Sequence, residues 1–226
     1  MGATRMGIAA LAAGVFAGLA AAAPAGAATI AVNGTCFLDS DTITVSGSGF
    51  APGASVNYAF NGVTQAAGTA DAAGNVAQQV PAPVLPIDSV VSTYNLTATD
   101  QSNLANVGSA QVTVTKLTAS LSPQKARPRR KIKFNVRGMP PAVTVFLHYV
   151  FHGRSRATIT LGRPNAPCGT MTKRRRFFPF DHPSVGIWTF QFDNKRRYSP
   201  GSRPAIRGKV QIYHAFRSSA VAPMLN

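Results

Sequence analysis

Side chains that could carry acid–base or metal chemistry are few in this sequence. The chain of 226 residues contains seven Asp, four His and two Cys, and it has no Glu. The sequence therefore offers few carboxylates for paired-carboxylate catalysis or for a carboxylate-rich metal centre. Asp39 and Asp41 could offer oxygens to Ca²⁺, but such a site takes about six to eight oxygen ligands. A solvated turn is the favoured interpretation of this pair.

The histidines suggest two further possibilities. His148 and His152 stand four residues apart, and on a strand they would lie about 13 Å from each other, too far to hold one metal ion. Asp181 and His182 are adjacent, so their side chains point apart, and no Ser or Cys stands in a recognisable nucleophile elbow. No glycine-rich phosphate loop or Cys-x-x-Cys motif occurs. The sequence predicts neither an enzyme nor a bound cofactor or metal.

The first residues have the order of a secretory signal. Arg5 precedes an apolar run over Ile8–Ala23, and Pro24–Ala27 offers an Ala-x-Ala processing site. A membrane anchor would need about 20 apolar residues, and this run is shorter and rich in Ala. We predict a signal peptide over 1–27, a mature N-terminus at Ala28 or Thr29, and a mature chain without a transmembrane segment. The expected location is secreted or extracellular, with cell-wall association as an alternative.

Charge divides the mature chain into two parts. Residues 29–116 contain five Asp and one Lys, a net charge of −4, whereas residues 117–226 contain 21 Lys and Arg and two Asp, a net charge of +19. This change predicts two domains, over 28–116 and 117–217, each the size of one β-sandwich, followed by a C-terminal tail over 218–226. The hinge near Thr115–Thr118 has no Gly or Pro run, so the domains should stack end to end with limited swing.

Alternating apolar residues predict strands in the first domain, and no segment has a sustained helical period. Ile43 and Val45 share one face, as do Val56, Tyr58 and Phe60. Turn chemistry separates the predicted strands, as in Asn61-Gly62. The expected strands are 42–48, 55–60, 75–80, 93–99 and 108–115, which together favour an antiparallel sandwich.

Two motifs of this domain resemble known families. Thr44–Gly53 (TVSGSGFAPG) followed by Thr69–Gly74 (TADAAG) resembles the bacterial immunoglobulin-like domains of secreted and surface proteins. That resemblance implies a non-enzymatic binding or structural module. The same stretch is similar to the neocarzinostatin group of secreted apoproteins that carry enediyne antibiotics, which implies a small-ligand carrier. That group has two internal disulfides, whereas this domain contains only Cys36, so a chromophore pocket is not expected.

The second domain repeats the pattern with basic residues on its polar faces. Trp188, Phe190 and Phe192 alternate and are predicted to be core rather than a sugar-binding platform. Gly186-Ile187-Trp188 resembles the corner before the sixth strand of immunoglobulin-like domains, with Trp in place of Tyr. The expected strands are 117–122, 131–137, 143–151, 156–161, 170–177, 186–192 and 206–216. The predicted fold class is all-β, with two tandem antiparallel immunoglobulin-like β-sandwiches.

The two cysteines fall in loops that this fold would bring together. Cys36 follows the first strand of the first domain, at the pole where the chain leaves. Cys168 follows the fourth strand of the second domain, at the pole where the chain enters. The hypothesis is an inter-domain disulfide, which needs Cα atoms within about 7 Å and which an exported protein could keep oxidised. Two free thiols are the alternative.

Strand alternation also places a basic cluster at the opposite pole of the second domain. Two Asp cannot neutralise it, so its counter-charges are either solvent ions or a partner. Lys195–Arg197 should lie at the other pole. The candidate polyanion-binding residues are Arg127, Arg129, Arg130, Arg154, Arg156, Lys173, Arg174, Arg175 and Arg176.

Three functions remain open from the sequence. The first is a secreted, non-enzymatic binding or spacer protein at the bacterial cell exterior, with a surface component or a protein as partner. The second is a module that binds a polyanion, such as a cell-wall polymer, DNA or anionic lipid, through the basic domain. The third is a small-ligand carrier. The oligomeric state is also open.

Overall fold

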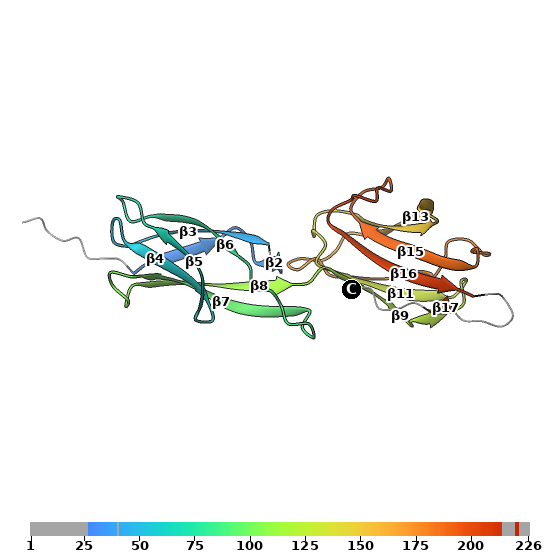
Figure 1. Ribbon diagram of the computed structural model, residues 1–226, viewed down its shortest axis with the longest axis horizontal. Helices are drawn as coiled ribbons and strands as arrows, with labels where there is room; N and C mark the ends of the chain where they lie inside the picture. Colours follow the sequence, from blue (N-terminus) through green and yellow to red (C-terminus); the bar gives the residue numbers. More distant parts are fainter. Residues whose placement is uncertain (1–26, 40, 214–219, 222–226) are drawn as a thin grey trace, which may run out of the picture.

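The chain forms two β-sandwiches that lie end to end along the long axis of the molecule (Figure 1). A computed structural model describes residues 27–39, 41–213 and 220–221. Every regular element in these ranges is a strand, and the predicted fold class, two tandem immunoglobulin-like sandwiches, is confirmed. The described part of the chain contains no helix that could span a membrane. The predicted signal peptide lies outside the described residues except for Ala27.

The first domain packs a three-stranded sheet against a five-stranded sheet. The smaller sheet has the order β1-β3-β6 and consists of β1 (Thr29–Val32), β3 (Thr42–Ser48) and β6 (Val76–Pro81). The larger sheet has the order β2-β8-β7-β4-β5 and consists of β2 (Cys36–Leu38), β8 (Val107–Thr115), β7 (Val91–Asp100), β4 (Ser55–Phe60) and β5 (Val63–Thr69). The pairing is antiparallel except between β2 and β8, which run parallel. The predicted inward residues of β3 and β4 are all buried.

Three strands of this domain have no counterpart in the prediction. Strand β5 is an edge strand next to β4 whose residues are mostly exposed and include two Ala and a Gly, so it shows no alternation of apolar residues. Strands β1 and β2 have four and three residues. They are too short for a period of two to stand out.

The second domain packs a three-stranded sheet against a six-stranded sheet. The smaller sheet has the order β14-β11-β9 and consists of β14 (Met171–Arg176), β11 (Lys131–Arg137) and β9 (Thr118–Ser122). The larger sheet has the order β10-β17-β16-β15-β12-β13 and consists of β10 (Lys125–Ala126), β17 (Ala220–Val221), β16 (Ala205–Ile212), β15 (Gly186–Asp193), β12 (Val145–Phe151) and β13 (Arg154–Gly162).

The segment predicted as a C-terminal tail contains a strand, which corrects that expectation. Strand β17 pairs with both β10 and β16. A pairing of two residues depends on backbone partners supplied by other strands, and two residues cannot display a periodic pattern. The predicted last strand, 206–216, ends in the structure at Ile212, and residues 214–216 lie outside the described residues.

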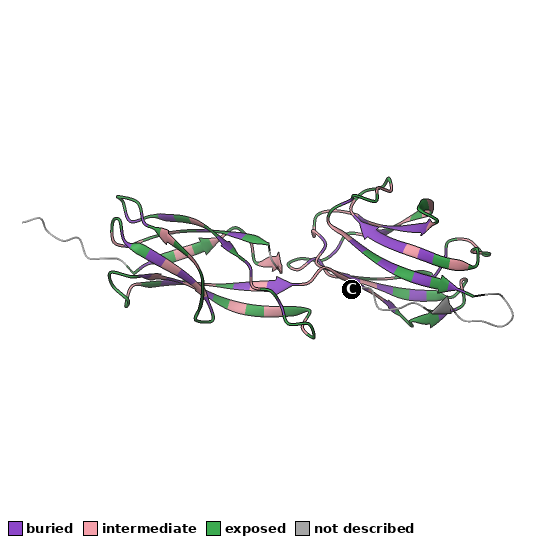
Figure 2. Cartoon of the chain, viewed as in Figure 1, coloured by how far each residue is buried: buried purple, intermediate pink, exposed green. Residues whose placement is uncertain are grey.

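An aromatic cluster fills the core of the second domain. The Trp188 ring lies 4.7 Å from the Phe151 ring and 5.2 Å from the Phe178 ring, measured between centroids. Trp188 Nε1 donates a hydrogen bond of 2.8 Å to the Ser184 carbonyl, the kind of upstream backbone contact that the corner Tyr makes in immunoglobulin domains. Buried and exposed residues alternate along the strands around this core (Figure 2). The aromatic residues at period two are therefore core residues, as predicted.

Neighbouring residues of β15 allow a matched test of this core. Trp188 is 2% exposed and Ile187 is 55% exposed. Trp188→Ala should lower the free energy of unfolding by about 3–5 kcal/mol, because it removes a large buried ring and leaves a cavity. Ile187→Ala should change it by less than about 0.5 kcal/mol. Urea unfolding monitored by far-UV circular dichroism measures both, and similar losses for the two variants would contradict this core.

Candidate functional site

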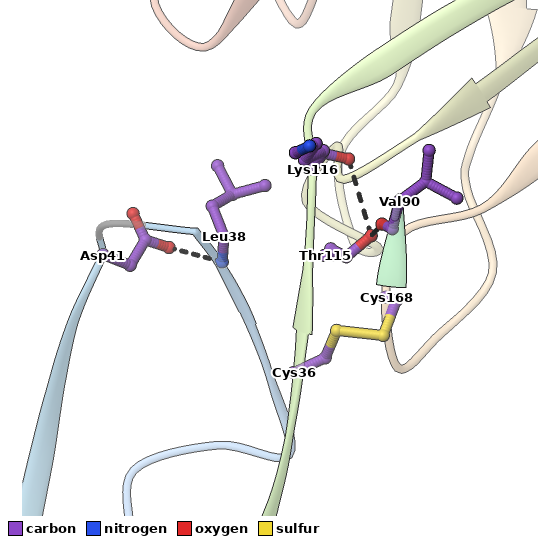
Figure 3. Close-up of a disulfide and its surroundings, with 7 residues drawn as sticks. All are labelled: Cys36, Leu38, Asp41, Val90, Thr115, Lys116 and Cys168. Atoms are coloured by element: carbon purple, nitrogen blue, oxygen red, sulfur yellow. Dashed lines mark hydrogen bonds between the residues drawn. A yellow bond between two sulfur atoms is a disulfide. The ribbon is translucent and has the colours of Figure 1, made fainter. Parts of the chain in front are cut away.

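A disulfide between Cys36 and Cys168 joins the two domains (Figure 3). Cys36 begins β2 and pairs in register with Thr113 of β8, while Cys168 lies in the loop between β13 and β14. The Cα atoms are 5.2 Å apart although the residues are separated by 132 positions in sequence. The structure thus brings together the two cysteines that the sequence hypothesis paired.

Two glycines of the second domain let the loop that carries Cys168 pack closely against residues 138–139. The Gly138 N–H donates a hydrogen bond of 3.0 Å to the Cys168 carbonyl, and Gly138 has a φ of +83°. A Cβ on Gly169, whose φ is +59°, would lie 1.6 Å from the Met139 carbonyl oxygen. A side chain at position 169 would therefore displace the loop that carries Cys168.

The connection between the domains is short and held on the first-domain side. Only Lys116 and Leu117 separate β8 from β9. The Thr115 hydroxyl and the Lys116 N–H each donate a 3.0 Å hydrogen bond to the Val90 carbonyl, and Lys116 Nζ donates to the Pro86 carbonyl. The linker is therefore fixed to the loop between β6 and β7 (Figure 3).

Asp41 stabilises the turn after β2 at the same junction. Its Oδ2 accepts a 2.9 Å hydrogen bond from the Leu38 N–H, and the Asp39 N–H donates to the Thr115 carbonyl at 3.0 Å. The pair considered as a Ca²⁺ site thus closes the turn after β2, as in the favoured interpretation. Among the described residues, no three His, Cys, Asp or Glu gather as metal ligands.

A small, open hollow at the junction is lined by both domains. Its volume is about 190 Å³, and its lining residues are Cys36, Phe37, Leu38, Asp41, Thr115, Gly138, Met139, Pro140, Pro141, Pro167, Cys168 and Gly169. Pockets for small organic ligands usually measure about 300–1,000 Å³. The hollow is below that range, and the first domain alone does not form it.

A buried polar network that sequence reasoning missed lies on the outer face of the six-stranded sheet. His148 and Asp193 are both fully buried. His148 Nε2 lies 3.1 Å from Asp193 Oδ1 and 3.0 Å from the Lys195 carbonyl oxygen. Both partners are acceptors, so Nε2 carries the proton. His148 Nδ1 lies 2.8 Å from the Thr158 hydroxyl.

The same network continues into the loop between β15 and β16. Gln191 Nε2 donates to Asp193 Oδ2 at 2.7 Å and to the Ser199 carbonyl at 2.8 Å. Arg207 Nε donates to Gln191 Oε1 at 2.8 Å. A hydroxyl, an imidazole and a carboxylate in a row are the groups of a hydrolase triad. Here the imidazole and the carboxylate are covered and bound to the loop backbone, so the row fastens that loop to the sheet.

The predicted basic cluster lies at the end of the second domain away from the junction. The loop between β10 and β11 carries Arg127, Arg129 and Arg130, and the Phe177 and Phe178 N–H groups donate to the Arg130 and Pro128 carbonyls. Phe178 contacts Trp188, which contacts Phe151 beside the β12–β13 hairpin. The remaining predicted residues lie at this end or along strands that reach it, namely Arg154 and Arg156 on β13 and Lys173, Arg174, Arg175 and Arg176 on β14.

One exposed carboxylate, that of Asp181, forms ion pairs with this cluster. Asp181 Oδ1 lies 3.1 Å from Arg129 Nε and 3.5 Å from Arg176 Nη1, which brings these two predicted residues together. The other carboxylate of the domain, Asp193, is buried in the network described above. Asp181 therefore organises two arginines and leaves most of the positive charge unpaired.

The second basic run lies at the opposite end of the sheet, as the strand alternation predicts. Strand β15 begins at Gly186, which pairs with Ile212, and ends at Asp193, which pairs with Phe146 and Ala205. Lys195, Arg196 and Arg197 follow that end and are exposed. The two basic groups are thus separated by the length of β15.

Comparison with known proteins identifies no family. No protein-family model matches the chain, and no curated protein matches it. Among solved structures, the chain is similar to the fibronectin(III)-like modules of Clostridium thermocellum CbhA, at 11% sequence identity over 87% of this chain and 91% of that chain, with a TM-score of 0.25. A likeness at this level carries no argument about function.

The disulfide should be present in the protein isolated under oxidising conditions. Peptides that contain Cys36 and Cys168 should appear as one linked species in a digest without reductant and as two species after reduction. Cys36→Ser with Cys168→Ser should lower the free energy of unfolding by about 2–5 kcal/mol, as reduction of the wild-type protein should. Peptide masses that are the same with and without reductant would rule the bond out.

Proposed function

We propose that this chain is an exported, non-enzymatic protein that acts as a stiff spacer or binding module at the bacterial cell exterior. The observation that carries the proposal is the junction: a two-residue linker and a disulfide connect the same two domains. A covalent bond beside the peptide connection turns a hinge into two points of attachment. Such a unit keeps a constant length and holds its far ends in a constant relative orientation.

Export is consistent with the junction and with the first residues of the chain. Disulfides persist in oxidising compartments outside the cytoplasm, and the N-terminal segment has the order of a secretory signal. The first domain begins at the predicted cleavage position, because Ala28 is buried and donates from its backbone N to Asn106 Oδ1 at 2.9 Å. Cleavage after Ala27 would leave the folded domain intact.

A stretching experiment tests the spacer directly. With handles at the ends of the mature chain, the disulfide should shield the 132 positions between Cys36 and Cys168 from extension. At about 3.3–3.6 Å per extended residue, the unfolded oxidised protein should be shorter than the reduced protein by about 450 Å. Single-molecule force spectroscopy measures this difference. Equal lengths in the two states would show that the domains are joined by the linker alone.

A second candidate function is polyanion binding through the far end of the second domain. The observation that favours it is the imbalance of charge. Of the nine predicted basic residues, only Arg129 and Arg176 form an ion pair with a described carboxylate, that of Asp181. Such a cluster is surrounded by counterions, and an anionic polymer gains affinity by releasing them. Binding should therefore fall steeply as salt is added.

Matched charge removal at the two ends of the domain tests this candidate. Replacing Arg129, Arg130 and Arg175 by Ser should lower the affinity for an immobilised anionic polymer at least tenfold and reduce the dependence on salt. Replacing Lys195, Arg196 and Arg197 by Ser removes the same charge from the opposite end and should change the affinity less than twofold. Equal losses would indicate diffuse attraction to a basic domain.

The third possibility, a small-ligand carrier, has less support. The hollow at the junction is small for an organic ligand and is lined partly by the second domain. The spacer and polyanion-binding functions are compatible with each other, because a stiff rod would hold the basic end at a constant distance from the first domain.

A further inference from the structure

The outer face of the sheet β14-β11-β9 carries like charges directly opposite each other. Lys131 pairs with Arg176 across the two strands, and Lys133 pairs with Arg174. All four residues are exposed. Directly opposed side chains of an antiparallel pair have Cβ atoms about 4.5–5.5 Å apart, and like charges in such pairs are destabilising. The four cations therefore form an array of two rows and two columns.

Among the described residues, a carboxylate contacts only one of these four cations. All seven Asp lie among the described residues. Arg176 contacts Asp181 at 3.5 Å, but Lys131, Lys133 and Arg174 form no ion pair with any described residue. These like charges destabilise the free sheet. Such an arrangement is expected where a bound anion neutralises the charges.

The rest of the face is polar and uncharged near its centre. Asn135 accepts a 2.9 Å hydrogen bond from the Thr172 hydroxyl of β14 and donates one of 3.3 Å to the Ser120 hydroxyl of β9. Ser122 stands opposite Lys133 on the β9 side. The outward residues of the three described strands include no aromatic ring on which a nucleic-acid base could stack, so recognition here rests on charge.

The spacing of the array selects the form of the anion. Lys131 and Lys133 are two residues apart on one strand, so the two cross-strand pairs lie about 6.7 Å from each other along the strands. Each Lys–Arg pair can hold one phosphate, and Arg adds a bidentate contact. The repeat of an extended phosphodiester chain has a comparable length and carries one charge. A chain that lies along β11 and β14 would place successive phosphates on successive pairs.

We propose that the face formed by Lys131, Lys133, Arg174 and Arg176 binds an unbranched polyol-phosphate polymer, which lies along β11 and β14 with one phosphate at each cross-strand pair. The inference rests on the polyanion-binding function and supplies its ligand class and two residues, Lys131 and Lys133, outside the predicted cluster. A flexible polyol backbone needs no stacking surface, and a narrow strip of two strands suits a single chain. Arg129, joined to Arg176 through Asp181, extends the path toward the end of the domain.

The test measures binding of poly(glycerol phosphate) oligomers to the oxidised full-length mature protein over a range of salt concentrations. Lys131→Thr with Lys133→Thr should weaken binding at least tenfold at low salt and make the slope of log K against log salt less steep by about 1.4. Arg196→Thr with Arg197→Thr removes the same charge elsewhere and should change the affinity less than twofold.

A stability measurement separates this role from a structural one. In the free protein at low salt, Lys133→Thr should raise the melting temperature by about 1–4 °C, because it removes one of two opposed cations. High salt should abolish the gain. If Lys133 were needed for folding, Lys133→Thr would lower the melting temperature, and that result would overturn the proposal.

Three other outcomes decide against it in distinguishable ways. Unchanged binding by the Lys131, Lys133 variant, together with loss in the Arg129, Arg130, Arg175 variant, would overturn the face and leave polyanion binding in place. Single-stranded DNA with the same number of phosphates, bound ten times more tightly than the polyol polymer, would assign the face to nucleic acid. Binding to vesicles that contain anionic lipid, without binding to the polymer, would assign it to a membrane surface.

Discussion

The close approach of two loops at the domain junction determines most of what this molecule can do. The Cα atoms of Cys36 and Cys168 are 5.2 Å apart. The loop that carries Cys168 accepts a hydrogen bond from the Gly138 N–H and passes close to the Met139 backbone at Gly169. The linker is held independently through Val90. With two attachments, we propose that the second domain keeps one orientation relative to the first. The position of its basic end follows from this constraint.

The two Asp side chains of the second domain have different roles. The second domain uses one of its two carboxylates internally, where Asp193 accepts from Gln191, the Lys195 N–H and His148. This network fastens the loop with Lys195–Arg197 near the junction and leaves only Asp181 to balance the far end. Because Asp193 is buried and its oxygens accept these hydrogen bonds, it forms no ion pair with a Lys or Arg side chain among the described residues. The like-charged pairs on β11 and β14 are the clearest consequence, because a sheet selected for stability alone would alternate the signs.

The sequence predicted those features that depend on a local pattern or on strand counting. Strands β3, β4 and β11 have the predicted bounds, since their inward residues alternate strictly. The cysteine pairing and the separation of the two basic runs followed from strand direction alone. Strand β5 was missed because an edge strand exposes both faces. The His148–Asp193 contact was missed because its partners are 45 positions apart and meet through the register of β12 and β15. The opposition of Lys131 and Lys133 to Arg176 and Arg174 likewise requires the β11–β14 register, which no pattern within one strand reveals.

The central claim is that the junction makes two sandwiches into one rigid body. Backbone ¹⁵N relaxation measures it most directly, because it reports the rotational diffusion of each domain separately. In the oxidised protein, amides of residues 28–115 and 118–212 should fit a single, elongated diffusion tensor, and reduction of Cys36–Cys168 should give each domain a faster tensor of its own. Two independent tensors in the oxidised protein would contradict this account.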